Sequence, residues 1–369
     1  MKTMCPHCNT EYDIEAQYKG QTFACPNCQK NFQIVDLTDK ETVSPVPSSN
    51  LIVQPLPGYN SWPFIQVLGG NLVCIYSRGT QHYYGEISRG VYARTSEDGG
   101  ASWSEETMVA NSSEGAESAI GKGLDSTAAL LVWIRHTGPE WHHDLYRTVD
   151  GTHFQRIAQL KLDPMPMQIT DIFTVPGVGL MSLWFAGNYK ENLEHSWGTL
   201  ISGDNGITWK QNIVESGLSK QDWPTEPSAV YLGNGRILAV ARVEGKSDKS
   251  SHAQFQLESY DYGKTWKRAR TNITDVLEST PSLVLDRGRI FNYYFQRMTG
   301  ELKCRTAAPD FIFGKPLCWS APETVAHGSK AWHHAGNVNA TLYGNLHYLA
   351  FYSGDENGTE ILLKIIHRQ

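Results

Sequence analysis

Short apolar runs alternate with glycine-containing turns along most of this chain. Pro227–Leu232 (PSAVYL) leads into the turn Gly233–Gly235, and a second run, Arg236–Arg242 (RILAVAR), follows and ends in a charged residue. Runs of this length, rich in β-branched and aromatic residues and bounded by Gly or Pro, are typical of strands. The pattern therefore predicts a chain of antiparallel hairpins. It returns at Pro63–Arg78, Pro281–Arg297 and Val338–Gly354.

An eight-residue pattern, Ser-x-Asp-x-Gly-x-Thr-Trp, is repeated within the same region. Its copies are SEDGGASW (Ser96–Trp103), the shorter TVDGTHF (Thr148–Phe154), SGDNGITW (Ser202–Trp209) and SYDYGKTW (Ser259–Trp266). The Asp and Ser/Thr side chains of such a turn can bond its own backbone N–H groups. Its Gly takes a conformation that a Cβ would resist, and its Trp can pack between sheets. We therefore expect these turns to stabilise the fold and to take no part in chemistry.

The spacing of the copies predicts the architecture. Their first residues are separated by 52, 54 and 57 positions. A period near 50 residues filled with short strands is typical of a β-propeller, and a period of about 53 fits six times into residues 51–369. We predict an all-β fold, a six-bladed β-propeller over residues 51–369. Leu51–Pro57 is expected to return to the last blade and close the ring.

Composition agrees with a turn-rich β protein and excludes some partners. The 369 residues include 33 Gly and 17 Pro, with 11% aromatic and 19% charged residues. The formal net charge of −6 gives no reason to expect nucleic acid as a partner. No apolar run approaches the length of a membrane span, so no membrane is expected. The N-terminal residues lack an apolar signal-peptide core. We therefore expect synthesis in the cytoplasm, with carriage on a phage particle as one hypothesis.

Four of the seven cysteines form two pairs with metal-ligand spacing. Cys5 and Cys8 lie in CPHC, and Cys25 and Cys28 lie in CPNC. Two such knuckles at this separation predict a Zn²⁺ site in a zinc ribbon, here residues 1–35. So short a segment cannot bury enough apolar surface alone, so bound zinc would supply folding free energy. Two disulfides or an iron site are the alternatives.

The predicted ribbon is followed by a linker at residues 36–50, which is polar, contains Pro and Ser, and has no periodicity. The ribbon carries balanced charges, which suits a structural module or a docking module for a protein partner. The neighbouring His142 and His143 are not expected to hold a metal together, because adjacent strand residues point to opposite faces. No cofactor is expected for the chemistry of the propeller.

The repeated turns resemble the Asp-boxes (BNR repeats) of the sialidase, or neuraminidase, superfamily, and the resemblance covers residues 51–369. In that family three arginines bind the substrate carboxylate, a glutamate polarises a tyrosine nucleophile, and an aspartate is the acid/base. Glu226 in WPTEPSAVYL and Arg242 in LAVAR resemble the family's glutamate and second arginine, and Arg297 in NYYFQR could match the third. The alternative for Glu226 and Arg242 is a structural ion pair at the rim.

Three positions depart from the family pattern. Ser61, in Ser61–Pro63, stands where the first arginine is expected. The loop expected to carry the aspartate, SRGTQHYYGEISRG, offers Arg78, His82 and Glu86 but no Asp. The expected tyrosine position reads KAWHHAGNVNA and offers His333 and His334.

The resulting rim combines arginines, histidines and tryptophans, which suits an acidic glycan as partner. Aromatic faces stack on sugar rings, arginines bind carboxylates, and His or Glu moves protons. The catalytic candidates are Glu226, His82, Glu86 and His334. The substrate-binding candidates are Arg78, Arg242, Arg297, Trp62, Trp223 and His333.

Three functions remain open from the sequence. The first is a sialidase-like glycoside hydrolase acting on sialic-acid-like or other acidic glycans, with Glu86 or His82 in place of the aspartate. The second is a non-catalytic glycan-binding propeller, such as a phage or surface receptor-binding protein. The third is a uronate polysaccharide lyase that uses His82 or His334 as base.

Overall fold

The chain divides into two compact units, Met1–Pro47 and Ser48–Gln369. The computed structural model describes residues 2–4, 10–18, 21–34, 49–54, 58–82, 89–113, 115–189, 194–244, 253–276, 278–330 and 334–368. Strands dominate these residues, and the single α-helix among them is α1 (Pro309–Ile312). Within the described part of the chain, no helix is both long and apolar enough to cross a membrane.

The first unit contains two short hairpins. Strand β1 (Lys2–Met4) pairs with β2 (Glu11–Asp13), β3 (Thr22–Ala24) pairs with β4 (Asn31–Gln33), and the 3₁₀ turn η1 (Ala16–Tyr18) lies between the hairpins. Its buried core among the described residues is only Cys25, Phe32 and Ile34, flanked by half-buried side chains that include Tyr12 and Cys28.

The second unit contains four sheets, each made of four consecutive antiparallel strands. They are β10 (Glu117–Leu124), β11 (Leu130–His136), β12 (His142–Thr148) and β13 (Gln155–Leu160); β14 (Gln168–Val175), β15 (Gly179–Ala186), β16 (His195–Ser202) and β17 (Lys210–Leu218); β18 (Pro224–Gly233), β19 (Arg236–Val243), β20 (Phe255–Ser259) and β21 (Lys267–Arg270); and β22 (Ser282–Asp286), β23 (Arg289–Gln296), β24 (Glu301–Ala307) and β25 (Glu323–His327). The 3₁₀ turn η2 (Lys220–Asp222) precedes β18.

A fifth, larger sheet joins the two ends of this unit. It combines β6 (Tyr59–Leu68), β7 (Asn71–Gly79), β8 (Gly90–Ser96) and β9 (Thr107–Ala110) with β26 (Gly336–Tyr343), β27 (Leu346–Asp355) and β28 (Gly358–His367). One parallel pair, Thr359 with Tyr59, links the two groups. Strand β5 (Asn50–Val53) pairs antiparallel with β28. The expected return of the segment that begins at residue 51 is therefore confirmed for the described residues 51–53.

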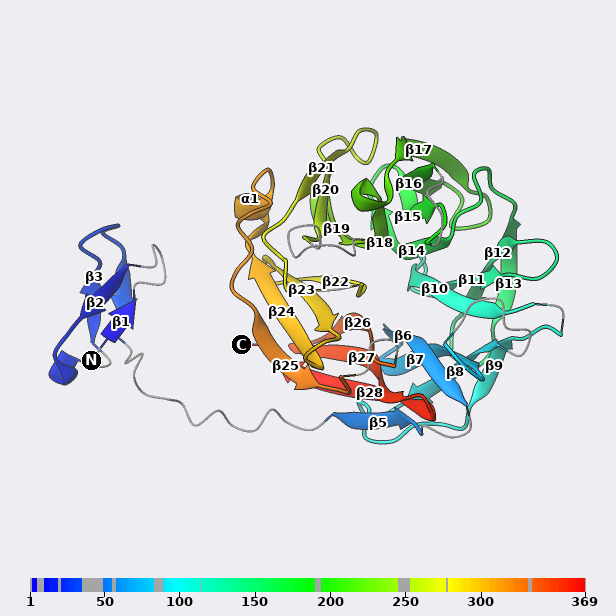
Figure 1. Ribbon diagram of the computed structural model, residues 1–369, viewed down its shortest axis with the longest axis horizontal. Helices are drawn as coiled ribbons and strands as arrows, with labels where there is room; N and C mark the ends of the chain where they lie inside the picture. The colour runs from blue at the N-terminus through cyan, green and yellow to red at the C-terminus, as the bar shows by residue number, and fades with distance from the viewer. Residues whose placement is uncertain are drawn as a thin grey trace. The chain divides into compact units, whose positions relative to one another are not determined.

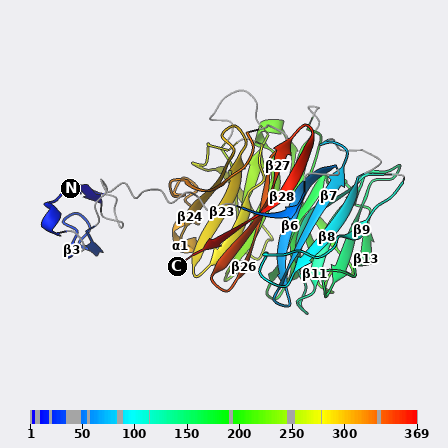
Figure 2. The ribbon, with the colours of Figure 1, turned by 90° about the horizontal axis from the view of Figure 1, so that it is seen from below.

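The first strand of each group of four lies at the centre of the second unit. Figure 1 shows β6, β10, β14, β18, β22 and β26 around the middle, with β9, β13, β17, β21 and β25 at the periphery. Each central strand contacts the next one, and β26 contacts β6. Seen from below, the strands run between two opposite faces of this unit (Figure 2).

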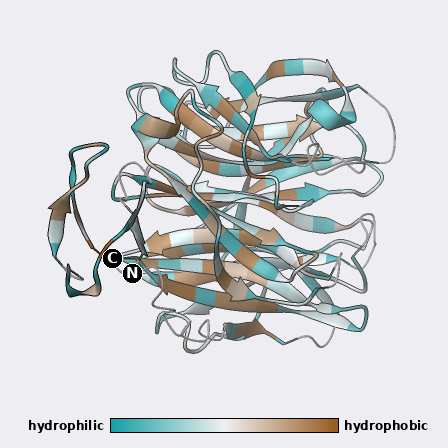
Figure 3. Cartoon of the chain, turned by 60° about the vertical axis from the view of Figure 1, so that its left-hand side comes forward, coloured by the Kyte–Doolittle hydropathy of each residue, from teal (hydrophilic) through white to brown (hydrophobic). Residues whose placement is uncertain are grey.

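Apolar side chains between neighbouring sheets form the core of the second unit. Leu131, Trp133 and Leu145 of one sheet pack with Trp184 and Leu200 of the next, and all five are fully buried. Figure 3 shows hydrophobic and hydrophilic stretches alternating along the strands. The inner strands are buried along most of their length, for example β11 and β15, because sheets with neighbours on both sides bury both of their faces.

The four repeated turns each join the third and fourth strands of a group, as Ser202–Trp209 joins β16 to β17. In this turn Ser202 Oγ accepts a bond from the Gly206 N–H at 2.8 Å. Asp204 accepts bonds from the N–H and the hydroxyl of Thr208 at 2.8 and 2.5 Å. The ring of Trp209 packs edge-on against Trp133 of the preceding sheet, with 5.0 Å between centroids. The turn's polar groups are thus used locally, as the sequence predicts.

These turns should make the stability of the fold depend on pH. Hydrogen bonds from Ser102 and Thr208 lower the pKa of Asp98 and Asp204, respectively, to about 2, below the unfolded value of about 3.9. Their stabilising effect is therefore complete above about pH 4 and is lost as the pH falls towards 2. We expect the double variant Asp98→Asn/Asp204→Asn to have a lower Tm than wild type at pH 6, and the difference to shrink towards pH 2. A Tm difference that stays constant over this range would contradict the assignment.

Candidate functional site

The central strands bulge at corresponding positions. The ladder between the first and second strands shifts register after Ser61, Ala119, Ile169, Thr225 and Gly336. A bulge leaves one residue out of the ladder and redirects its side chain. At three of these bulges a residue other than glycine has positive φ: Trp62 at 51°, Glu226 at 47° and Asn337 at 43°. Such conformations cost about 1–3 kcal/mol each and cluster at functional sites.

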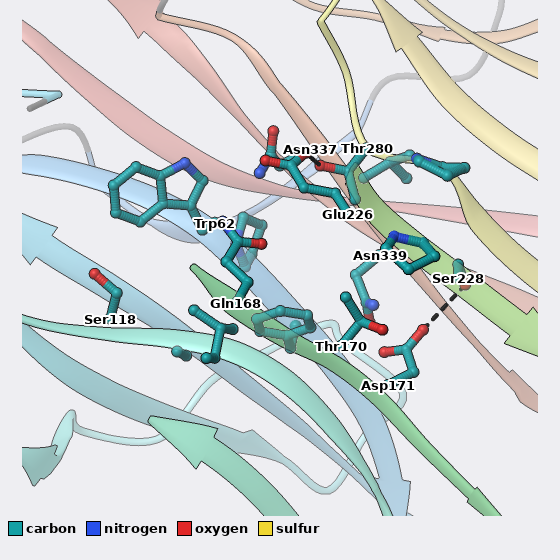
Figure 4. Close-up of a pocket in the computed structure, with 17 residues that line it drawn as sticks. Trp62, Ser118, Gln168, Thr170, Asp171, Glu226, Ser228, Thr280, Asn337 and Asn339 are labelled. Carbon is teal, nitrogen blue, oxygen red and sulfur yellow. Dashed lines mark hydrogen bonds between the residues drawn. The ribbon is translucent and has the colours of Figure 1, made fainter. Parts of the chain in front are cut away.

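The bulges surround a cavity at the centre of the second unit. Each of the six central segments contributes to its lining, for example through Trp62, Ser118, Gln168, Glu226, Thr280 and Asn337 (Figure 4). Its volume of about 40 Å³ can hold a few water molecules. Sites for small molecules are typically larger than about 300 Å³, so a sugar ring does not fit inside this cavity.

Glu226 is the carboxylate with most contacts at the cavity. It is 4% exposed, and Nη1 of Arg242 lies 3.1 Å from both of its oxygens. Thr280 donates a hydroxyl bond to Oε2 at 2.6 Å, and the Tyr189 hydroxyl lies 3.5 Å from Oε1. Side chains 16, 37 and 54 positions away in the sequence therefore meet at one carboxylate.

Arg242 is held by a second acid on the side away from the cavity. Its Nε lies 2.6 Å from Oε1 of Glu244, which also accepts a bond from Thr225 at 3.1 Å. Burial alone would lower the pKa of Arg242, but the charges of Glu226 and Glu244 outweigh it and raise that pKa. Burial raises the pKa of Glu244 although Arg242 opposes the shift. Arg242 is thus a buried, permanently charged link between two carboxylates.

Arg297 presents a different environment. It is 4% exposed, packs against Gly336, where an added Cβ would lie 3.0 Å from Nε and Nη2, and donates from Nη2 to Oδ1 of Asn337 at 3.3 Å. Its Nε has no hydrogen-bond partner, and no carboxylate of a described residue forms an ion pair with it. A buried guanidinium without a counter-ion is a natural place for an anionic group.

A tyrosine between two histidines lies on the other side of the cavity. The Tyr59 hydroxyl is 3.2 Å from Nδ1 of His82 and 3.2 Å from Nδ1 of His334. The His82 ring meets Trp62, which lines the cavity, edge-on at 5.7 Å. Burial raises the pKa of Tyr59, and the charge of Arg297 partly opposes this. A proton next to the cavity can therefore lie on the Tyr59 hydroxyl, on the His82 ring or on the His334 ring.

The remaining carboxylate at the cavity is Asp171. It accepts a bond from Ser228 at 3.0 Å (Figure 4). Burial raises its pKa, while Lys122 and the Ser228 bond lower it in part. Lys122 itself donates to Gln66 at 2.9 Å.

The structure brings six of the predicted residues to this region. Glu226 and Trp62 line the cavity. Arg242 contacts Glu226, Arg297 contacts the lining residue Asn337, and His82 contacts Trp62. His334 is connected to His82 through the Tyr59 hydroxyl. Arg78 is not among the lining residues: it binds both oxygens of Glu106, at 2.8 and 2.5 Å, and Asn60 at 2.8 Å. Trp223 is fully buried and packs on His195 at 4.2 Å. Glu86, His333, Cys5 and Cys8 lie outside the described residues.

Sequence reasoning missed Tyr189, Thr280, Tyr59 and Glu244. Only Glu244 carried a local signal, because it follows Arg242 by two residues and so shares a strand face with it. The others reach the site from loops or strand starts that show no pattern.

Comparisons with known proteins show the fold alone. No family model and no curated protein sequence matches the chain. Among solved structures, the chain is similar to a protein of unknown function from Dyadobacter fermentans, with 15% identity, a TM-score of 0.72, and coverage of 87% of this chain and 98% of that one. It is similar to the NanB sialidase of Streptococcus pneumoniae, with 11% identity, a TM-score of 0.64, and coverage of 91% and 73%.

A third similar structure is Trypanosoma rangeli sialidase in complex with sialic acid, with 13% identity, a TM-score of 0.61 and coverage of 86% of this chain. The chain spans 57% of the length of that protein. The second unit of this chain therefore has an all-β fold similar to that of sialidases.

Proposed function

We propose that the second unit is a six-bladed propeller of the sialidase type. The strand groups β6–β9, β10–β13, β14–β17, β18–β21 and β22–β25, with β26–β28 completed by β5, would be its six blades. The single parallel pair between β28 and β6 is then a contact between the last and the first blade. The closed series of contacts among the central strands supports this reading.

We further propose that this unit is a glycoside hydrolase acting on sialic-acid-like or other acidic glycans. The proposal rests on two environments at one cavity: Glu226 is held by Arg242 and Thr280, and Arg297 is buried without a carboxylate partner among the residues that the structure describes. An acidic sugar supplies the carboxylate that Arg297 lacks, and guanidinium–carboxylate pairs are strong and directional.

The proposed reaction is hydrolysis of the bond between the anomeric carbon and the leaving oxygen. The substrate carboxylate binds Arg297, and the sugar ring lies outside the small cavity, over Trp62. Water supplies a hydroxyl to the anomeric carbon, the leaving oxygen takes a proton from His82, His334 or Glu86, and the proton that the water loses restores that acid. The Tyr59 hydroxyl can relay that proton between His82 and His334, since it is 3.2 Å from each. Glu226 stabilises positive charge that develops at the sugar.

The experiment is to incubate the full chain with a panel of sialosides and uronate oligosaccharides and to analyse products by mass spectrometry and ultraviolet absorbance. The proposal expects two products whose masses add up to the mass of the substrate plus one water. An unsaturated, ultraviolet-absorbing product would instead identify a uronate lyase. Absence of any product across the panel, together with saturable binding, would overturn hydrolysis.

The second candidate is a glycan-binding protein without turnover, and two observations favour it. Arg242 already forms ion pairs with two carboxylates, Glu226 and Glu244, and the cavity volume is about 40 Å³. A site of this kind can bind a carboxylate at Arg297 without placing the glycosidic bond next to Glu226.

For the first unit we propose a structural zinc held by Cys5, Cys8, Cys25 and Cys28. The two described donors support this: Cys25 is buried, and Cys28 is half-buried three residues later in the β3–β4 turn. A core of three buried side chains among the described residues is also too small to hold the unit together. Zinc would fix this turn and leave the surface of the unit for docking to a protein partner.

A further inference from the structure

A cluster of imidazoles and carboxylates lies on the β10–β13 sheet, and none of its members is among the residues that line the central cavity. Glu117 of β10 is paired in register with His136 of β11, and His136 is paired with His142 of β12. Asp144 follows His142 by two residues, so the two side chains share one face of β12. Three neighbouring strands therefore bring these four side chains together.

The distances within the cluster are those of a small metal site. One donor atom each from His136, His142 and Asp144 lies within 4.8 Å of the others. Nε2 of His136 is 3.2 Å from Oδ2 of Asp144, and Nε2 of His142 is 3.8 Å from Oδ1. Ligand atoms around tetrahedral zinc are about 3.3 Å apart, as follows from bond lengths of about 2.0–2.1 Å. The two imidazole rings stack at 4.5 Å, and both Nε2 atoms face the carboxylate of Asp144.

Both histidines have the outer partners that metal-binding histidines normally have. Nδ1 of His136 is 3.3 Å from Oε1 of Glu117, and Nδ1 of His142 is 2.9 Å from the carbonyl oxygen of Glu140. When these Nδ1 atoms carry the proton, each Nε2 presents a lone pair to the centre of the cluster. Carboxylate or carbonyl partners of this kind fix the tautomer and raise the basicity of a ligating imidazole.

Two buried carboxylates in this cluster have unused oxygens. Glu117 and Asp144 are each 1% exposed, and Oε2 of Glu117 and Oδ1 of Asp144 have no hydrogen-bond partner. Arg156 reaches only Oδ2 of Asp144, at 3.3 Å, with a side chain that is 55% exposed. A buried carboxylate oxygen without a partner is costly, and a bound cation would supply partners for these two oxygens.

An opening leads to the cluster from solvent. A cavity of about 190 Å³ is lined by Glu117, His136, Glu140 and His142, together with parts of the 112–115 and 138–139 turns. It gives an entry path for an ion and room for a water molecule as a fourth ligand.

We propose that His136, His142 and Asp144 bind a divalent metal ion of the zinc type, with Glu117 as the partner that orients His136 and with an open position facing this cavity. The site is separate from the predicted cysteine site in the first unit. It goes beyond the proposed glycan chemistry and does not depend on it. The competing account is an imidazolium at His136 that neutralises the two carboxylates without any metal.

The test uses the full chain, stripped with a chelator and titrated with Zn²⁺ and with Co²⁺. His142→Ala is the main variant, because this side chain is partly exposed and its loss should leave the fold intact. His153→Ala is the matched control, a histidine 90% exposed in the turn after the same strand. The cysteine site is unchanged in all three proteins, so any metal that it binds adds the same number of equivalents to each of them.

We expect wild type and His153→Ala to bind one more metal equivalent than His142→Ala. Their Co²⁺ complexes should show visible bands of a nitrogen–oxygen site in addition to thiolate charge-transfer bands. Glu117→Gln should retain the site with affinity lowered about 10–100-fold. Equal stoichiometry in wild type and His142→Ala would overturn the proposal and leave the imidazolium network. A second measurement needs no variant: the ¹⁵N chemical shifts of the histidine rings in wild type. If Zn²⁺ left these shifts unchanged, the proposal would also be overturned.

Discussion

Replacing Glu226 by Gln should lower kcat/KM for the acidic glycan that the protein hydrolyses by about 10²–10⁴-fold, the range for loss of a positioned charged catalytic group. The amide keeps the size of the side chain and can still accept bonds from Arg242 and Thr280. It loses the negative charge beside the developing positive charge of the sugar. Steady-state kinetics on the substrate identified by product analysis would measure the loss.

Glu244→Gln is the matched control for this variant. Glu244 binds the same arginine, at 2.6 Å, but is not among the residues that line the cavity. It should change kcat/KM much less than Glu226→Gln does. Equal losses in the two variants would mean that both act only through the position of Arg242, and the catalytic role of Glu226 would then be wrong.

Replacing Arg242 by Met should lower the free energy of unfolding by about 3–5 kcal/mol, the cost of removing one partner from a buried ion pair. The substitution leaves Glu226 and Glu244 buried without their shared cation, and methionine fills much of the vacated space. Urea denaturation at neutral pH would measure the change. Low pH should reduce the loss, since burial raises the pKa of Glu244 and its protonated carboxyl no longer needs the arginine.

Arg297→Met is the contrasting variant. Arg297 is even less exposed than Arg242, at 4%, but has no ion pair with a described carboxylate, so its removal should leave stability unchanged or raised. Binding of an acidic glycan should nevertheless weaken by about 10–100-fold, as expected for the loss of a charged hydrogen bond of about 1.5–3 kcal/mol. If Arg297→Met destabilised the protein as much as Arg242→Met, Arg297 would be a structural residue and the proposed anion site would fail.

The repeated turns and the pair formed by Glu226 and Arg242 were predictable because their signals are local. A turn such as Ser202–Trp209 encodes its own bonds within eight residues. The hairpin from β18 to β19 then sets Glu226 opposite the end of the strand that carries Arg242. Local sequence order is sufficient to place such groups.

Other parts of the site depend on partners that no local pattern reveals. Arg78 ends a second strand just as Arg242 does, but Glu106, at the start of the segment before β9, binds its guanidinium. Trp223 is covered by His195, which comes from the preceding sheet. Tyr59 acquires a role only because residue 334 returns to it after almost the whole second unit.

The pairing of β5 with β28 also has a consequence for biosynthesis. While the ribosome translates this unit, the segment around Leu51 emerges early but must wait for Ile361 before it has a hydrogen-bonding partner. Contacts so distant in sequence slow folding and leave an exposed edge prone to wrong associations in the meantime. The nascent protein should therefore need protection until its last strand has left the exit tunnel.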